Sequence, residues 1–176
     1  MQVIKPPALL PEGSPEYRIF LAGTIDMGQS EDWQEHLTQL LKGLPGIILN
    51  PRRGEWDSSW EQKFENVKFR EQVEWELDAL DMSDRILMYF APESKSPISL
   101  LELGLHANSK KLVVCCPEGF YRKGNVDIVC ERYQIETVKK LEDFVDTCMF
   151  DLQLSDALDD LLRGDRDETE RLEPRE

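Results

Sequence analysis

Short apolar runs alternate with longer amphipathic stretches along this chain of 176 residues. The apolar runs are bounded by Gly, Pro, Asn or charged residues, which is typical of buried strands. They predict five strands, at residues 17–22, 47–49, 85–91, 111–116 and 134–136. Between them, apolar residues at helical spacing predict helices at residues 30–42, 64–82, from 96 onward, within 117–133 and over 138–162.

This alternation indicates parallel βαβ units with right-handed crossovers and helices on both faces of one sheet. We therefore expect an α/β fold, specifically a flavodoxin-like (Rossmann-like) three-layer sandwich with a five-stranded parallel sheet of order 2-1-3-4-5. The proline-punctuated residues 1–16 are expected to form an N-terminal arm, residues 17–163 the domain, and residues 164–176 an acidic flexible tail.

Charge and composition limit the classes of protein to which this chain can belong. Thirty-five acidic against 21 basic residues give a formal net charge of −14, which disfavours a nucleic acid polymer as partner. No apolar run is long enough to cross a bilayer, and the first residues lack the apolar core of a signal peptide, so we expect no membrane association and a cytoplasmic location. The four cysteines include no CxxC pair and there are only two histidines, so no metal and no other cofactor is expected.

In doubly wound sheets, ligands bind beyond the carboxyl ends of the strands where the strand order reverses. Here the first strand ends at Gly23 and Thr24, and the third leads to a helix that Ser96 is expected to cap. In that helix Glu102 is an isolated acid among aliphatic residues, close enough to the helix N-terminus for the helix dipole to favour its ionised form. Alternatively, Glu102 projects from a polar edge or pairs with an adjacent cation, Lys110 or Arg85.

Several common catalytic motifs are absent from the sequence. It contains no G-x-G-x-x-G after the first strand, no G-x-x-x-x-G-K-[ST] and no G-x-S-x-G, which disfavours NAD dehydrogenases, P-loop NTPases and serine hydrolases. Carboxylates remain as the reactive groups at the expected crevice: Glu102 and the acids of the preceding helix. Paired carboxylates fit the chemistry of glycosidic bonds.

Four segments carry a more specific resemblance. These are IFLAGT (19–24), NPRRGEW (50–56), EQVEWELDALDMSDRILMYF (71–90) and SPISLLELG (96–104). Together they resemble the nucleoside 2-deoxyribosyltransferase-like family over residues 17–145. The resemblance implies that Glu102 is the nucleophile and that Glu76 is the acid that orients the substrate. Asp84 matches the family's aspartate that precedes the third strand, and it is expected to be a substrate ligand. For Glu76 the alternative is a solvated acid on the outer helix face.

Two positions depart from the family's pattern. Phe20 stands where many members carry Tyr, and Ser96 where some carry an acid that contacts the sugar or base. The resemblance also implies a homo-oligomer, dimer or higher, in which a neighbouring subunit completes each site. We expect Asn125 to make that contact, the alternative being a turn residue after Gly124.

The loop after the second strand contributes the remaining candidates for substrate binding. Asn50 ends that strand, and Trp56 or Trp60 is expected to stack on a base, unless each covers the core. Arg52 and Arg53 suit a 5′-phosphate, or else form salt bridges on this acidic surface.

These features favour an enzyme that cleaves the N-glycosidic bond of a 2′-deoxynucleoside through a covalent glutamyl-deoxyribosyl intermediate and transfers the sugar to another base. One alternative is a hydrolase acting on the N-glycosidic bond of 2′-deoxynucleotides. Another is a catalytically silent nucleotide-binding or sensor module. In each case the expected partner is a small-molecule deoxynucleoside or deoxynucleotide.

Overall fold

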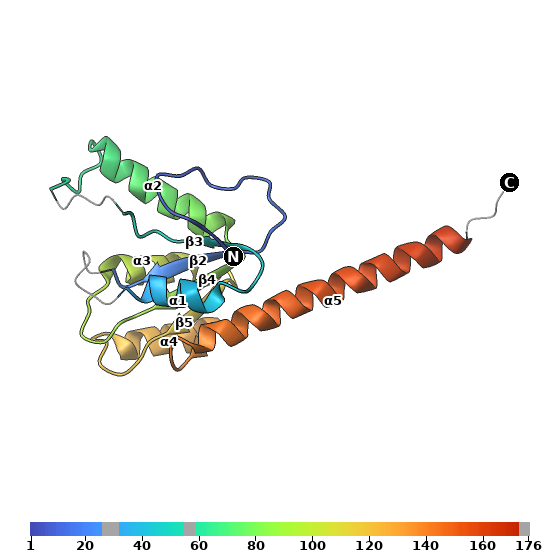
Figure 1. Cartoon of the computed structure of the whole chain (residues 1–176). Helices are drawn as coiled ribbons and strands as arrows, with labels where there is room; N and C mark the ends of the chain where they lie inside the picture. The colour runs from blue at the N-terminus through green and yellow to red at the C-terminus, as the bar shows by residue number, and fades with distance from the viewer. Residues whose placement is uncertain (26–31, 55–58, 173–176) are drawn as a thin grey trace. The chain divides into compact units, whose positions relative to one another are not determined.

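The fold is built on one parallel sheet of six strands (Figure 1). The computed structural model describes residues 1–25, 32–54 and 59–172, with side chains as far as residue 158. In chain order the strands are β1 (Gln2–Ile4), β2 (Arg18–Gly23), β3 (Ile47–Leu49), β4 (Arg85–Tyr89), β5 (Leu112–Cys115) and β6 (Glu136–Val138). They lie side by side in the order β1-β3-β2-β4-β5-β6.

The predicted topology is confirmed for the five predicted strands, because β2 to β6 follow the order 2-1-3-4-5. The predicted number of strands is wrong. A sixth strand, β1, lies at the sheet edge within the segment expected to be an arm, and its Val3 pairs with Ile48 of β3. With only three residues, two of them exposed, β1 has too short a pattern to be recognised as a strand.

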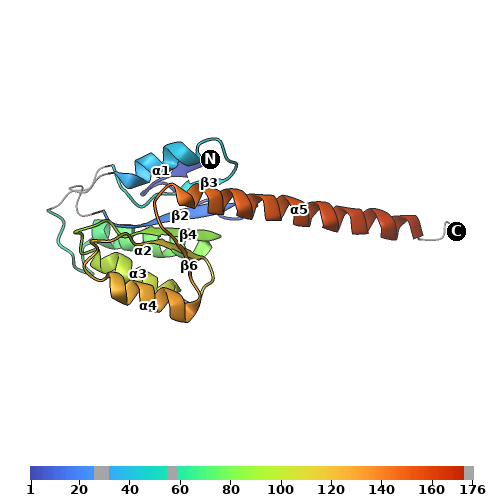
Figure 2. The ribbon, with the colours of Figure 1, turned by 90° about the horizontal axis from the view of Figure 1, so that it is seen from below.

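Helices cover both faces of the sheet, as Figure 2 shows. They are α1 (Trp33–Leu41), α2 (Val67–Met82), α3 (Pro97–His106) and α4 (Lys123–Tyr133). A fifth helix, α5 (Asp143–Leu172), ends the described chain. Phe20 and Met88 point to one face, into an apolar core shared with residues of α2, α3 and α4. On the other face the ring of Tyr89 lies 5.4 Å from that of Trp33 in α1. The expected three-layer sandwich is therefore confirmed.

The chain divides into two compact units, Met1–Phe144 and Val145–Glu176. The first contains all six strands and α1 to α4, and the second contains the greater part of α5. Backbone helix continues to Leu172, into the predicted 164–176 tail, whose last four residues lie outside the described part of the chain. The domain boundary at residue 163 stays a prediction. Among the described residues, no helix has the length and apolar character required to cross a membrane.

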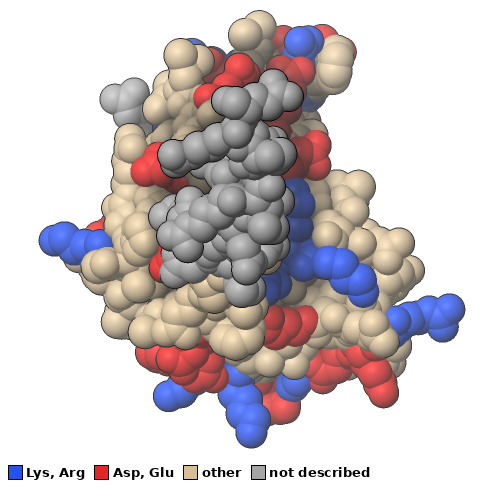
Figure 3. All heavy atoms as spheres, turned by 90° about the vertical axis from the view of Figure 1, so that its right-hand side faces the viewer, with Lys and Arg blue, Asp and Glu red and all other residues tan. Residues whose placement is uncertain are grey.

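Acidic and basic side chains are intermingled on the face shown in Figure 3. Among the described residues, several charged side chains form pairs, for example Arg18 with Asp84 at 3.3 Å and Arg70 with Glu74 at 2.8 Å. Exposed pairs of this kind contribute only about 0–1 kcal/mol each. The fold therefore depends on its apolar core far more than on its surface ion pairs.

Gly23, at the carboxyl end of β2, allows that strand to approach β4 closely. Its φ is +136°, and a Cβ at this position would collide with the carbonyl oxygen of Tyr89 and lie 2.8 Å from the Tyr89 nitrogen. The same carbonyl accepts a hydrogen bond from the backbone N–H of Thr24 at 2.9 Å. Only glycine combines this backbone conformation with this contact.

We expect Gly23→Ala to destabilise the fold by about 1–3 kcal/mol from backbone strain alone, with the steric clash in addition. Chemical denaturation measures the change. Gly43→Ala is the matched control, because Gly43 has no atom within 4 Å of the added Cβ. Equal stability of the two variants would contradict the role given to Gly23.

Candidate active site

Glu102 and Glu76 come from neighbouring helices on the same face of the sheet. Glu102 is only 8% exposed, because it lies on the inward side of α3 with Ser99 and Leu103. It therefore does not project from a polar edge. The proposed cationic partners are engaged elsewhere, since Lys110 contacts the Tyr133 carbonyl oxygen and Arg85 pairs with Glu136. Glu76 is half-buried on α2, so the alternative of a fully solvated acid is wrong.

Burial dominates the electrostatics of these two carboxyl groups. Burial, and to a smaller extent the charge of Glu76, raises the pKa of Glu102 to about 8, so the ionised form is disfavoured, contrary to the expectation from the helix dipole. Burial also raises the pKa of Glu76 to about 7, against a lowering effect of the hydrogen bond from Gln72. Because each negative charge opposes the other, the pair favours a state with a single proton near neutral pH. One carboxylate and one carboxylic acid is the combination that glycosidic chemistry uses.

Gln72 is a member of this site that the sequence analysis missed. It lies one helical turn before Glu76 on the same side of α2 and is 3% exposed. Its Nε2 donates to Glu76 Oε1 at 2.8 Å and to the carbonyl oxygen of Pro51 at 2.9 Å. In the sequence Gln72 is marked only by its place four residues before an acid, which is too common on helices to indicate a site. The amide links Glu76 to the loop that follows β3.

Three hydroxyl groups join the ends of β2 and β4 to the start of α3. Thr24 Oγ1 lies 3.0 Å from Ser94 Oγ and 2.7 Å from Ser96 Oγ, and the two serines are 3.0 Å apart. Thr24 also accepts from the backbone N–H of Ala91 at 2.9 Å. The cluster fixes the two strand ends that flank the expected crevice. Ser94 was not anticipated from the sequence.

The expectation that Ser96 caps α3 with its side chain is wrong. Ser96 does occupy the N-cap position, but its hydroxyl makes no capping bond. Its φ of +41° places it in the left-handed region, and its oxygen is turned toward Thr24 and Ser94. The residue that stands where some family members carry an acid is thus a structural part of the hydroxyl cluster.

The segment after β3 is held by side chains from both layers of helices. Asn50 is buried, and its Oδ1 accepts from the backbone N–H of Arg52 at 2.9 Å. Arg52 pairs with Asp32 at 3.2 Å, and its Nη1 donates to Gln34 at 3.4 Å. Arg52 therefore forms the salt bridge that was the alternative to phosphate binding.

Arg53 is engaged in a similar way but keeps one unused donor. It pairs with Glu71 at 3.4 Å, and its guanidinium lies 5.2 Å from the ring centre of Trp60. Lys68 lies 5.6 Å from the same ring, so Trp60 contacts two cations. Trp56, the other candidate for stacking on a base, lies outside the described residues. The Nε of Arg53 is buried and has no hydrogen-bond partner among the described residues.

Three predicted residues are not brought together with the carboxyl pair. Phe20 is fully buried in the apolar core. Asp84 precedes β4 and accepts from the backbone N–H of Arg18 at 2.8 Å, which places it at the amino edge of the sheet. Its prediction as a substrate ligand is corrected on that ground, because the expected crevice is at the carboxyl edge. Asn125 is exposed in the first turn of α4.

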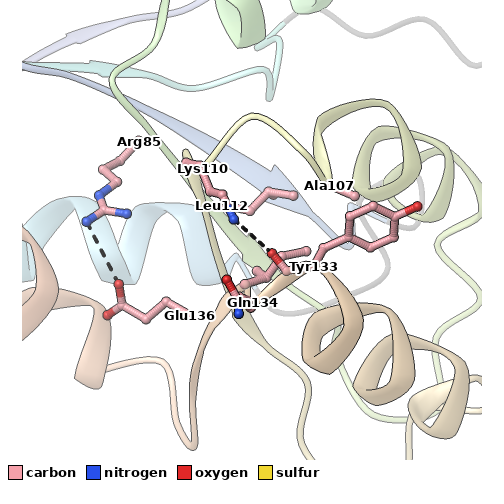
Figure 4. A pocket seen from close by; sticks show the side chains of 8 residues that line it. Arg85, Ala107, Lys110, Leu112, Tyr133, Gln134 and Glu136 are labelled. Carbon is pink, nitrogen blue, oxygen red and sulfur yellow. Dashed lines mark hydrogen bonds and ion pairs between the residues drawn. The ribbon is translucent and has the colours of Figure 1, made fainter.

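Two cavities lie away from these residues. One of about 150 Å³ opens at the amino ends of β4, β5 and β6, where Figure 4 shows Arg85 turned toward Glu136 and Lys110 toward Tyr133. Another of about 520 Å³ lies between α4 and the strands β5 and β6. No residue predicted for the site lines either cavity. Within the described ranges, no group of three His, Cys, Asp or Glu side chains could hold a metal ion.

The raised pKa of Glu102 predicts a pH-dependent effect of Glu102→Gln on stability. In the unfolded chain this carboxyl ionises near pH 4.5, and in the folded chain near pH 8. Below pH 4.5 it is protonated in both states. As the pH rises from 4.5 to 8 the unfolded chain loses this proton first, so the free energy of unfolding falls. Glutamine does not ionise. We expect Glu102→Gln to match the parent near pH 4.5 and to exceed it at pH 8 by on the order of 3 kcal/mol.

Urea denaturation at pH 4.5, 6 and 8 measures this difference. The matched control is Glu118→Gln, whose side chain is 92% exposed and should show no comparable change with pH. A constant offset between Glu102→Gln and the parent at all three pH values would contradict the buried carboxyl.

Comparison with known proteins adds evidence from outside the chain. The sequence model of a family described as nucleoside 2-deoxyribosyltransferase like matches residues 16–120. A solved structure of a CMP N-glycosidase from Clostridium botulinum aligns with a TM-score of 0.47 at 17% identity, covering 76% of this chain and 98% of that one. No curated protein matches the chain. Since the family match spans more than half of the 176 residues, the chain belongs to the nucleoside 2-deoxyribosyltransferase-like family.

Proposed function

We propose that this protein cleaves the N-glycosidic bond of 2′-deoxynucleosides and transfers the deoxyribosyl group to another base, with Glu102 as the nucleophile. The observation that carries the proposal is a buried carboxyl on α3 that interacts electrostatically with a second carboxyl on α2. Glu102 has no hydrogen bond or ion pair among the described residues, so its reactive oxygens are not committed to a structural partner. Family membership supports the same assignment.

The chemistry proceeds in two displacements at C1′. Because Glu102 has the higher pKa of the pair, the first displacement begins with transfer of its proton to Glu76. The Glu102 carboxylate then forms a bond to C1′ while the bond from C1′ to the base nitrogen breaks, and the electron pair leaves with the base. In the second, a nitrogen of the incoming base attacks C1′ and gives its proton to the Glu76 carboxylate, while the Glu102 oxygen leaves as a carboxylate. Both transition states resemble an oxocarbenium ion, so a negative carboxylate stabilises them as charge develops. Water in place of the second base gives hydrolysis.

The electrostatics of the pair suit this sequence of steps. A desolvated carboxylate is unstable next to a second negative charge, but it is stabilised by the positive charge that develops on the sugar. Glu76, bonded to Gln72, provides an acceptor or a protonated acid that holds the substrate next to Glu102. The departing base leaves with a negative charge unless it acquires a proton, and a protonated Glu76 is the group on α2 that can supply one.

Incubation of the protein with 2′-deoxyadenosine and a second free base, followed by liquid chromatography, tests the proposal. A new deoxynucleoside is expected. Glu102→Ala and Glu102→Gln should each lower turnover by at least about a thousandfold, because they remove the nucleophile. Glu118→Gln is the control for loss of a glutamate charge. Unchanged turnover by either Glu102 variant would refute the assignment, and binding without turnover by the parent would support a silent sensor.

A second candidate function is hydrolysis of 2′-deoxynucleotides, which the buried Nε of Arg53 favours, because it has no hydrogen-bond partner among the described residues. A guanidinium with a free donor suits a 5′-phosphate. On this alternative, the parent releases free base faster from 2′-deoxyadenosine 5′-monophosphate than from 2′-deoxyadenosine. Arg53→Ala should then lower kcat/KM at least about tenfold for the nucleotide, and leave the nucleoside nearly unaffected. Equal effects on both substrates would exclude phosphate recognition by Arg53.

The proposal includes a homo-oligomer. Asn125 is exposed at the start of α4, as a contact with a second copy requires. Sedimentation of the parent measures the oligomeric state directly.

A further inference from the structure

The amide of Gln72 is held in one orientation by two acceptors. Its Nε2 has two hydrogens, one directed at the Pro51 carbonyl oxygen at 2.9 Å and the other at Glu76 Oε1 at 2.8 Å. If the amide were flipped, its oxygen would face both of these acceptors and repel them. The Pro51 carbonyl, which can only accept, therefore assigns the nitrogen and the oxygen of this side chain.

The oxygen of the Gln72 amide, unlike its nitrogen, has no hydrogen-bond partner among the described residues. This atom, Oε1, is also buried. Leaving a buried acceptor unsatisfied costs roughly 1–3 kcal/mol, and a native structure retains such a group where a ligand or another function satisfies it. This acceptor is on the same amide that bonds Glu76, and Glu76 interacts in turn with Glu102.

We propose that Gln72 is a positioning residue for Glu76 and that its free amide oxygen accepts a hydrogen bond from the bound substrate. This inference rests on the proposed function, since the substrate is taken to be a 2′-deoxynucleoside at Glu102. The donor on such a substrate is either an exocyclic amino group of the base or the 3′-hydroxyl of the sugar. Both meet the requirement for an N–H or O–H beside the buried oxygen.

The first consequence concerns Glu76 and is measured without substrate. The hydrogen bond from Gln72 lowers the pKa of Glu76 against the effect of burial, so its removal should raise that pKa above about 7. Carbon-13 NMR of glutamate side chains, with Glu76→Gln to assign the signal, follows this titration in the parent and in Gln72→Met. Gln39→Met is the control, because Gln39 is an exposed glutamine that bonds Glu35 at 2.7 Å on α1.

The second consequence concerns the substrate. A site that hydrogen-bonds a substrate group discriminates against the analogue lacking it. We expect the parent to prefer either 2′-deoxycytidine over 2′-deoxyuridine, or 2′-deoxycytidine over 2′,3′-dideoxycytidine, by at least about tenfold in kcat/KM. In Gln72→Met that preference should fall to near unity, because the acceptor is gone. The pair whose preference disappears identifies the donor as the base or the sugar.

A second variant separates the two roles. Gln72→Glu has nearly the same shape and keeps an acceptor oxygen, but replaces the amide donor by a carboxyl group beside Glu76. We expect it to retain the substrate preference while raising the pKa of Glu76 and moving the limb of the pH-rate profile that Glu76 controls to higher pH. A purely structural glutamine would alter thermal stability without moving that limb.

The outcomes distinguish the inference from the function on which it rests. If the parent releases no base from any of the four nucleosides, deoxyadenosine included, the proposed function fails, while the NMR titration still tests the link between Gln72 and Glu76. If the parent is active and Gln72→Met keeps both the substrate preference and the Glu76 titration of the parent, the inference is overturned.

Discussion

The central constraint in this structure is the burial of the Glu102 carboxyl beside that of Glu76. Taking a carboxylate out of water is costly unless a cation or several donors compensate it, and the described part of the chain offers Glu102 neither. The fold accepts this cost because the surrounding core is large: Leu103 and its neighbours hold α3 against the sheet, so the acid cannot turn outward. An uncompensated buried acid with a second acid beside it is typical of a reactive site rather than of a structural ion pair.

Much of the scaffold could be predicted from the sequence, because central parallel strands are apolar on both faces and stand out as continuous runs. The same reasoning missed β1, an exposed edge strand that is recognisable only through its pairing with β3. Glu102 was predictable because an acid in an aliphatic helix is conspicuous. Gln72 was not, since a glutamine on a helix rich in polar residues becomes significant only when its partners are known.

Asp84 illustrates a different limit of sequence reasoning. Its place in the motif was recognised, but a residue that precedes a parallel strand lies at the amino edge of the sheet, opposite the edge where ligands bind. There it accepts two bonds from Arg18 and joins the starts of β2 and β4. Arg52 and Arg53 show a similar limit for charged residues. The sequence shows two neighbouring cations, but only the fold shows that Arg52 pairs with Asp32 and Arg53 with Glu71.

The hydroxyl cluster at the opposite edge has a consequence for the direction of its protons. Ser94 donates to the Ala91 carbonyl oxygen, so its own proton is used, and it can only accept from Thr24 and Ser96. Thr24 already accepts from the Ala91 amide. Only the protons of Thr24 and Ser96 are left for the three contacts of the triangle, so one of the three oxygen pairs always lacks a hydrogen between its atoms. A donor that reaches this buried corner finds a free lone pair, whereas a carbonyl or phosphate oxygen can be bound only by a proton taken from the triangle.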